Sequence, residues 1–156
     1  MTKVEVGVVA DWLVLLSAIV LFDSLFLVWS RLSPAYLAIS DRLQTLQGVP
    51  HDPTGWQVYS AADIVLALLA VGLFAVALMG TRMARCGALA AVLLALAFAI
   101  HAADVPPTNG AASAFRPSLG VDGYVAPSPR PGPGETVAII ALAAAVVGIG
   151  SSLAAD

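Results

Sequence analysis

The sequence predicts an all-α integral membrane protein in which four transmembrane helices form a bundle with two extended outer loops. Three observations favour this fold class. The chain of 156 residues is 60% hydrophobic and only 11% charged, and its mean hydropathy is +0.92. A soluble domain of this size does not need so much apolar material. Four long apolar runs, each suited to crossing a bilayer core of ~30 Å, are separated by polar or Pro- and Gly-containing segments.

The four runs define a single membrane domain, residues 1–156. We expect the spans at about residues 8–31, 60–80, 86–103 and 136–155, the outer loops at 32–59 and 104–134, and a tight turn at 81–85. We expect the first run to be an uncleaved anchor, because its apolar core exceeds the ~7–15 residues of a signal peptide and acidic residues precede it. Within the first loop, residues 36–48 carry apolar side chains at helical spacing and predict a short amphipathic helix on the membrane surface.

Four spans place both termini on the same side of the membrane. Lys3, Arg82 and Arg85 lie in the short segments on that side. Positive charge in short segments marks the cytoplasmic face. The sequence therefore predicts a multi-pass protein of the plasma membrane with both termini cytoplasmic, and these three bases are expected to contact anionic lipid headgroups.

Aromatic residues mark the predicted membrane interfaces. Trp12 and Trp29 flank the first apolar run, and seventeen residues of helix cover about 26 Å. Because indoles prefer the two interfaces, both residues are expected to be interface anchors of one helix. Trp56 and Tyr59 precede the second run and are expected to anchor it in the same way.

Polar residues at the outer ends of the spans form the candidate site. With the predicted orientation, Asp23, Asp63, His101, Asp104 and Glu135 fall in the outer third of the membrane or at its outer surface. Asp23 is the deepest, six residues or about 9 Å from the end of its span. A carboxylate at that depth is costly and is a functional-site candidate. The candidate intramembrane polar site therefore consists of Asp23, Asp63, His101 and Asp104.

Three interpretations of this site stay open. In the first, Asp23, Asp63, His101 and Asp104 bind a metal, since carboxylates and imidazole suit Zn, Mn, Fe or Cu. No Glu-x-x-His or His-x-x-x-His spacing supports it, the single Cys86 excludes a multi-cysteine site, and no cofactor is predicted. In the second, Asp23 transfers protons or conducts ions.

The third interpretation is structural. Asp23 or Asp63 hydrogen-bonds a neighbouring helix, a serine such as Ser24 or Ser60, or an arginine of a partner chain. Asp63 also suits a solvated first-turn position, because an acid is favourable at a helix N-terminus.

Small residues are spaced for helix packing in the last two spans. Ala91, Ala95 and Ala99 recur every four residues, as do Ala144 and Gly148. Small residues at this spacing let membrane helices approach closely. We therefore expect the third and fourth spans to pack against protein rather than to face lipid alone.

One segment carries a resemblance. Residues 54–79, TGWQVYSAADIVLALLAVGLFAVALM, resemble a segment common in small uncharacterised multi-span proteins of actinobacteria. The resemblance covers about one sixth of the chain. It implies a membrane location and assigns no activity, so it transfers no functional residues.

The function expected from the sequence is that of a small accessory subunit. The net charge of −3 without a basic patch excludes nucleic acid as a partner, and no phosphate-binding loop or nucleophile elbow is present. We expect a structural subunit of an oligomeric or multi-subunit plasma-membrane complex, not catalytic on its own, whose partners are the lipid bilayer and other membrane subunits or copies of itself. The alternatives are a homo-oligomeric ion or proton channel or transporter using Asp23, and a membrane metalloenzyme subunit.

Overall fold

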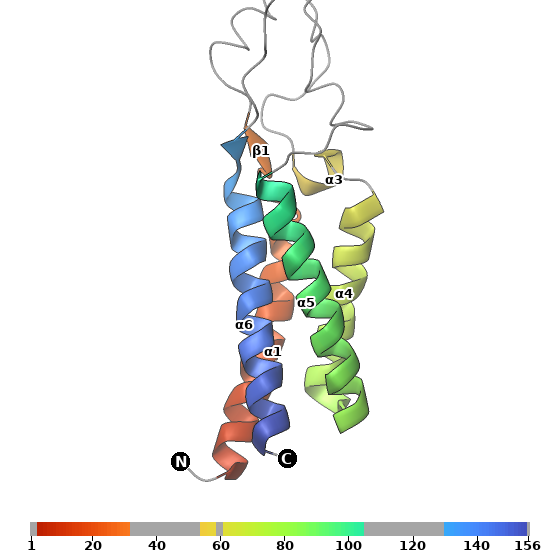
Figure 1. Cartoon of the computed structure of the whole chain (residues 1–156), viewed down its shortest axis with the longest axis vertical. Helices are drawn as coiled ribbons and strands as arrows, with labels where there is room; N and C mark the ends of the chain where they lie inside the picture. The colour runs from red at the N-terminus through yellow and green to blue at the C-terminus, as the bar shows by residue number, and fades with distance from the viewer. Residues whose placement is uncertain (1–2, 32–53, 59–60, 105–129, 156) are drawn as a thin grey trace, which may run out of the picture.

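Four long helices form the protein. The computed structural model describes residues 3–31, 54–58, 61–104 and 130–155. The long helices are α1 (Lys3–Ser24), α4 (Ala61–Met79), α5 (Arg82–Asp104) and α6 (Pro133–Ala155), and the short elements are α3 (Gly55–Val58), β1 (Ser30–Arg31) and β2 (Arg130–Pro131) (Figure 1). Each long helix is long and apolar enough to cross a membrane. The predicted four-helix fold class is confirmed, and the chain has the pattern of a multi-pass membrane protein.

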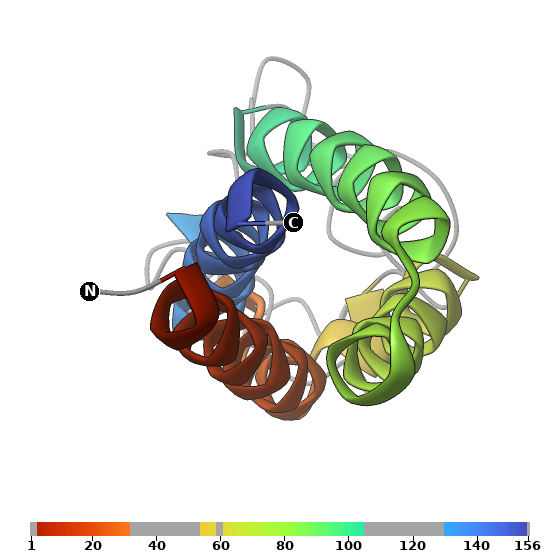
Figure 2. The same cartoon turned by 90° about the horizontal axis from the view of Figure 1, so that it is seen from below.

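The four helices are arranged as a ring in the order α1, α6, α5, α4 (Figure 2). α1 packs most extensively against α6, and α5 packs much more lightly against α4 than against α6. Both chain termini lie at one end of the bundle, which we call the terminal end. The two short strands lie at the other end. α1 and α5 therefore lie across the ring from each other, as do α4 and α6.

Small residues let α1 and α6 approach closely. The inner face of α6 carries Ala138, Ala141, Ala145, Gly148 and Ser152, all of them buried. A Cβ on Gly148 would lie only 2.8 Å from Val14 Cγ2 and 3.1 Å from the Ala10 carbonyl oxygen. The predicted packing of the fourth span is thus confirmed at Gly148. In α5 only Ala99 of the predicted row is buried, and Ala91 is exposed.

The first helix begins and ends earlier than predicted. α1 covers Lys3–Ser24, whereas the predicted span was 8–31. The Ser24 hydroxyl donates to the Leu21 carbonyl (2.6 Å), and the Trp29 indole N–H donates to the Ser24 carbonyl (2.6 Å). The next three backbone N–H groups bond three residues back instead of four. These bonds satisfy the last carbonyls of the helix, so the chain leaves the helical path before Trp29. The prediction that one helix joins Trp12 to Trp29 is wrong.

α5 and α6 begin earlier than predicted, whereas α4 begins within one residue of the prediction. Thr81 caps α5, because its Oγ1 accepts the Ala84 N–H (3.3 Å) and its carbonyl accepts the Arg85 N–H (2.9 Å). The predicted turn at 81–85 is therefore mostly helix. α6 begins at Pro133 and not at 136, since proline suits the first position of a helix. The predicted amphipathic helix at 36–48, Tyr59 and most of both outer loops lie outside the described residues.

Candidate functional site

An open groove between α1 and α4 is lined by apolar residues and one carboxylate. The cavity has a volume of about 270 Å³ and is lined by Ala18, Ile19, Phe22, Asp23, Ala70, Val71 and Phe74. We call it the α1–α4 groove. On α4 the lining begins nine residues after Ala61, which is about 14 Å along the helix. On α4 the groove therefore lies well inside the helix. On α1 its lining extends to Asp23 in the last turn, so the prediction that Asp23 lies six residues inside its span is wrong, because α1 ends at Ser24.

The groove has a floor of small residues and walls of large ones. Ala18 and Ala70 are 2% and 3% exposed and form the floor. Ile19, Phe22, Val71 and Phe74 form the walls, and each is at least 40% exposed. Among the described lining residues only Asp23 is charged, and it is exposed. It continues an exposed row of α1 through Trp12, Leu16 and Ile19, so the carboxylate lies on the outer face of the bundle.

Asp63 and Glu135 point the other way. Asp63 is in the first turn of α4, as predicted, but it is fully buried and not solvated. It lies in register with Leu66, Ala70 and Leu73 on the inner face of α4. Glu135 is in the first turn of α6 and is 3% exposed, on the face that also carries buried Ala138. Because packing rotates these helix faces inward, both acids enter the bundle.

The predicted polar layer is therefore divided between faces. His101 is exposed in the last turn of α5. Asp104 ends the same helix, and its side chain lies outside the described part of the chain. Among the residues that the structure describes, no three His, Cys, Asp or Glu side chains come together as metal ligands. Asp23 faces outward, whereas Asp63 faces inward, so these two carboxylates do not form one site.

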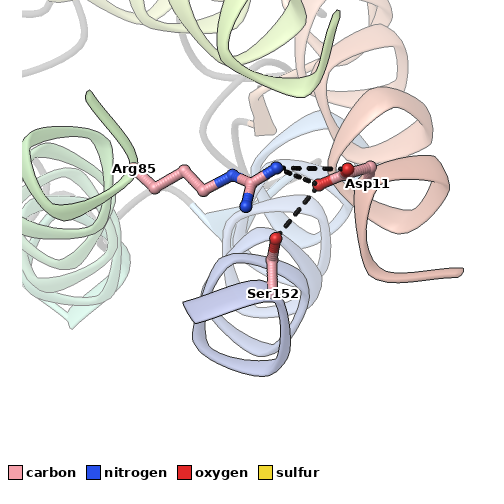
Figure 3. Close-up of polar contacts among 3 residues, drawn as sticks. All are labelled: Asp11, Arg85 and Ser152. Carbon is pink, nitrogen blue, oxygen red and sulfur yellow. Dashed lines mark hydrogen bonds and ion pairs between the residues drawn. The ribbon is translucent and has the colours of Figure 1, made fainter. Parts of the chain in front are cut away.

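At the terminal end, an ion pair crosses the ring. The Arg85 guanidinium donates to both carboxylate oxygens of Asp11 at 3.2 Å, and the Ser152 hydroxyl donates to Asp11 Oδ1 at 3.1 Å (Figure 3). Side chains of α1, α5 and α6 thus meet at one carboxylate. The sequence predicts Arg85 as a headgroup contact, yet its side chain is only 15% exposed. Arg82 is exposed, as a contact with lipid headgroups requires. Lys3 is the first residue of α1, and its side chain lies outside the described part of the chain.

At the opposite end, Trp29 is enclosed instead of anchoring an interface. It is 2% exposed, so the predicted anchor role is wrong for this residue. A Cβ added to Gly55 would lie 3.2 Å from the indole Nε1, and one on Gly134 would lie 2.7 Å from it. Trp12 is 60% and Trp56 37% exposed, which suits their predicted role. We call residues 25–31, 54–55 and 130–134 the Trp29 clasp.

Backbone hydrogen bonds hold the clasp together. β1 and β2 pair antiparallel, with Ser30 opposite Pro131 and Arg31 opposite Arg130. The Gly132 N–H donates to the Trp29 carbonyl (2.8 Å), and the Gly134 N–H donates to the Val28 carbonyl (2.8 Å). Val28 also forms a bridge with Thr54. The sequence predictions missed this element, and the alternating Pro and Gly of PGPG at 131–134 was the only local signal for it.

Comparisons of the chain with protein-family models, curated proteins and solved structures found no match. The resemblance of residues 54–79 to small multi-span proteins of actinobacteria therefore stays a prediction. The function must be inferred from the geometry of the bundle. Its salient feature is a carboxylate on the outer face, in a groove whose other lining residues are apolar.

Proposed function

We propose that this protein is a small structural accessory subunit of an oligomeric or multi-subunit plasma-membrane complex. The observation that carries the proposal is the exposure of Asp23 in the α1–α4 groove. Ionisable residues in membrane spans almost always face protein or a water-filled cavity and pair with a second group. An acid on the outer face of one chain is therefore best accommodated when another subunit covers it.

The interior of the bundle supports a structural role over conduction through one chain. Most of the largest fully buried side chains are apolar, and the polar ones are Asp63, Ser24 and Ser152, which lie near the ends of their helices. Buried acids occur in the first turns of α4 and α6. An ion path through the chain would need polar groups along its length to replace the lost hydration. Between the two ends, the described core is apolar except for buried Ser17, whose hydroxyl donates to the Leu13 carbonyl of its own helix.

The orientation belongs to the same proposal. Both chain termini lie at the terminal end, next to the connection between α4 and α5. Lys3 and Arg82 lie at this end, close to short connections. Positive charge in short segments favours the cytoplasmic side. We therefore assign the terminal end to the cytoplasm and the Trp29 clasp to the outer surface.

The two alternative functions have less support from the geometry. A metalloenzyme needs converging ligands, and the described residues do not provide three. A channel using Asp23 needs several copies whose grooves face a shared path, since Asp23 lies outside the bundle of one chain. Proton or cation flux in liposomes that is unchanged by Asp23→Asn would contradict the channel.

The mass of the native particle tests the proposed function. The protein is expressed at its natural level, solubilised in a mild detergent and measured by light scattering with the detergent mass subtracted. We expect a protein mass well above that of one chain of 15.9 kDa. A particle that contains a single chain and no other protein would contradict the proposal.

A further inference from the structure

We propose that Glu135 is a proton-binding site inside the bundle, and that the Trp29 clasp stays closed only while this carboxyl carries its proton. The inference goes beyond the accessory function and concerns a single chain. It depends on three features of the described residues: the burial of Glu135, a second acid that faces the same layer of the interior, and the contact between the start of α6 and the clasp.

The Glu135 carboxyl is enclosed in the bundle. Its residue is only 3% exposed. Among the residues that the structure describes, none provides a hydrogen-bond partner for the buried Oε1 atom. An unpaired charge in such surroundings is far more costly than a neutral carboxyl. The first turn of a helix favours a negative charge, but by less than the burial of an unpaired carboxylate costs. Glu135 therefore holds a proton in the closed bundle.

A second acid faces the interior at the same level of the bundle. On α4, Asp63 lies seven residues, or about 10 Å, from Ala70 in the groove floor. On α1, which runs in the opposite direction (Figure 1), Ser24 lies six residues, or about 9 Å, from Ala18 in the same floor. Gly134, which precedes the proton-binding residue, also meets Ser24, because a Cβ added to it would lie 2.9 Å from the Ser24 carbonyl oxygen. The two acids therefore enter one layer of the interior from opposite sides of the ring.

The groups around this layer favour a neutral carboxyl. A charge on Asp63 would disfavour a charge on Glu135. The inner face of α1 contributes Leu21, Ser24 and Leu25 here, and none of them titrates. The other ionisable residues of the described elements at this end are exposed Asp23, Arg31 and His101, and Asp104 and Arg130, whose side chains lie outside the described part of the chain.

The clasp lies directly beside the site. Gly134 is the last clasp residue and precedes Glu135 in the first turn of α6. Its N–H donates to the Val28 carbonyl (2.8 Å), and a Cβ added to it would lie 2.7 Å from the Trp29 Nε1 atom. Loss of the proton leaves a charge that needs water, and water reaches this buried carboxyl only when the segments around it separate. Release of the proton therefore opens the clasp.

Infrared spectroscopy detects the proton directly. The full chain is reconstituted in phosphatidylcholine vesicles at neutral pH, where a protonated carboxyl has a C=O stretching band at higher frequency than the bands of a carboxylate. We expect Glu135→Gln to lose part of this band. Glu5→Gln, which removes an exposed acid in the first turn of α1, should retain it. An unchanged band in Glu135→Gln, or a loss seen only in Asp63→Asn, would overturn the inference.

The fluorescence of Trp29 tests the link to the clasp. Trp12→Phe and Trp56→Phe leave Trp29 as the only tryptophan, and quenching by acrylamide reports its exposure. When the pH is raised from neutral to mildly alkaline, we expect the quenching constant to rise severalfold. Glu135→Gln should keep it low at both pH values, whereas Glu5→Gln should respond like the parent chain. The same pH response with and without Glu135→Gln would show that the clasp does not depend on this proton.

Thermal unfolding at neutral pH separates a neutral acid from a buried ion pair. Glutamine has nearly the shape of a protonated glutamate, so Glu135→Gln should leave Tm unchanged. If an arginine from outside the described residues pairs with Glu135, the same variant leaves that arginine unpaired and lowers Tm strongly or prevents folding, and the inference is wrong. All three measurements use one purified chain, so their outcome is independent of the mass of the native particle.

Discussion

Trp29 determines where α1 ends and how the clasp is built. Its indole N–H bonds the Ser24 carbonyl, and its ring fills the space between two glycines, Gly55 and Gly134. A Cβ on Gly132 would collide with the Val28 carbonyl. The chain therefore needs glycine where its backbone passes the Trp29 indole and the Val28 carbonyl. Two variants test this reading at single positions.

Gly134→Ala should destabilise the protein. The added methyl would collide with the Trp29 ring and lie 2.9 Å from the Ser24 carbonyl oxygen. Overpacking of this kind lowers the free energy of unfolding by about 1–3 kcal/mol. Gly150→Ala is the matched control, since it lies in the same helix with nothing within 4 Å of an added Cβ. Thermal unfolding in detergent measures both, and equal stability of the two variants would contradict the assigned role of Gly134.

Trp29→Phe should cost the bond that caps α1. The phenyl ring keeps most of the apolar volume but cannot donate to the Ser24 carbonyl, which the indole contacts at 2.6 Å. The loss of one such hydrogen bond lowers the free energy of unfolding by about 1 kcal/mol. Trp12→Phe is the control, because Trp12 is 60% exposed and no part of the clasp. If the two substitutions change the unfolding free energy equally, the indole bond contributes nothing.

At the scale of helices, packing is unequal around the ring. In the apolar stretch of each helix, 39% of the residues of α6 are buried, compared with only 11% in α5. α5 is nevertheless tied to the opposite helix, because the Arg85 side chain reaches Asp11 of α1 next to Ser152 of α6 (Figure 3). One polar cluster thus connects three helices at the terminal end. It compensates in part for the small apolar contact of α5.

A double-mutant cycle measures this connection. Asp11→Asn and Arg85→Gln should each destabilise the protein, and together they should cost less than the sum of the two. We expect a coupling of about 1 kcal/mol and not more, because the Asp11 side chain is 33% exposed and partly screened. Arg82→Gln, three residues earlier and exposed, should have no such coupling with Asp11→Asn. Strictly additive effects of Asp11→Asn and Arg85→Gln would show that the ion pair does not hold α5.

At the scale of the whole molecule, the bundle has two ends with different chemistry. The terminal end carries the chain termini and the turn before α5, and the other end carries the clasp. The proposed orientation places the terminal end in the cytoplasm. Two exposed positions, Thr81 and Arg31, lie at the two ends and report on it.

Cysteine labelling tests the orientation. In a Cys86→Ser background, which removes the only cysteine, Thr81→Cys should react with an impermeant maleimide in inverted vesicles and not in intact cells. Arg31→Cys should show the opposite pattern. Positive charge near short segments is the physical reason for this expectation. Labelling of Thr81→Cys in intact cells would reverse the proposed topology.

The helices could be predicted from the sequence because apolar composition is a local property. The runs that became α4 and α6 were placed within a few residues, since their length and hydropathy are continuous. The end of α1 was misplaced, because Leu25 to Trp29 is as apolar as the helix before it. Local bonds end the helix, and the segment that follows it is held by backbone bonds from glycines about a hundred residues later in the chain. No local pattern contains such a contact.

The sequence by itself determined that four apolar helices exist and that Asp23 and Asp63 lie within or next to apolar runs. Only the tertiary structure decided which way these acids face. α1 is rotated by its small-residue contact with α6, where Gly148 meets Ala10 and Val14. That rotation leaves Asp23 on the outer face, while packing of Leu66 and Leu73 turns Asp63 inward. The direction in which a helical side chain points is set by packing against other helices, so it depends on several segments of the chain at once. Formation of a helix in an apolar run depends on that run alone.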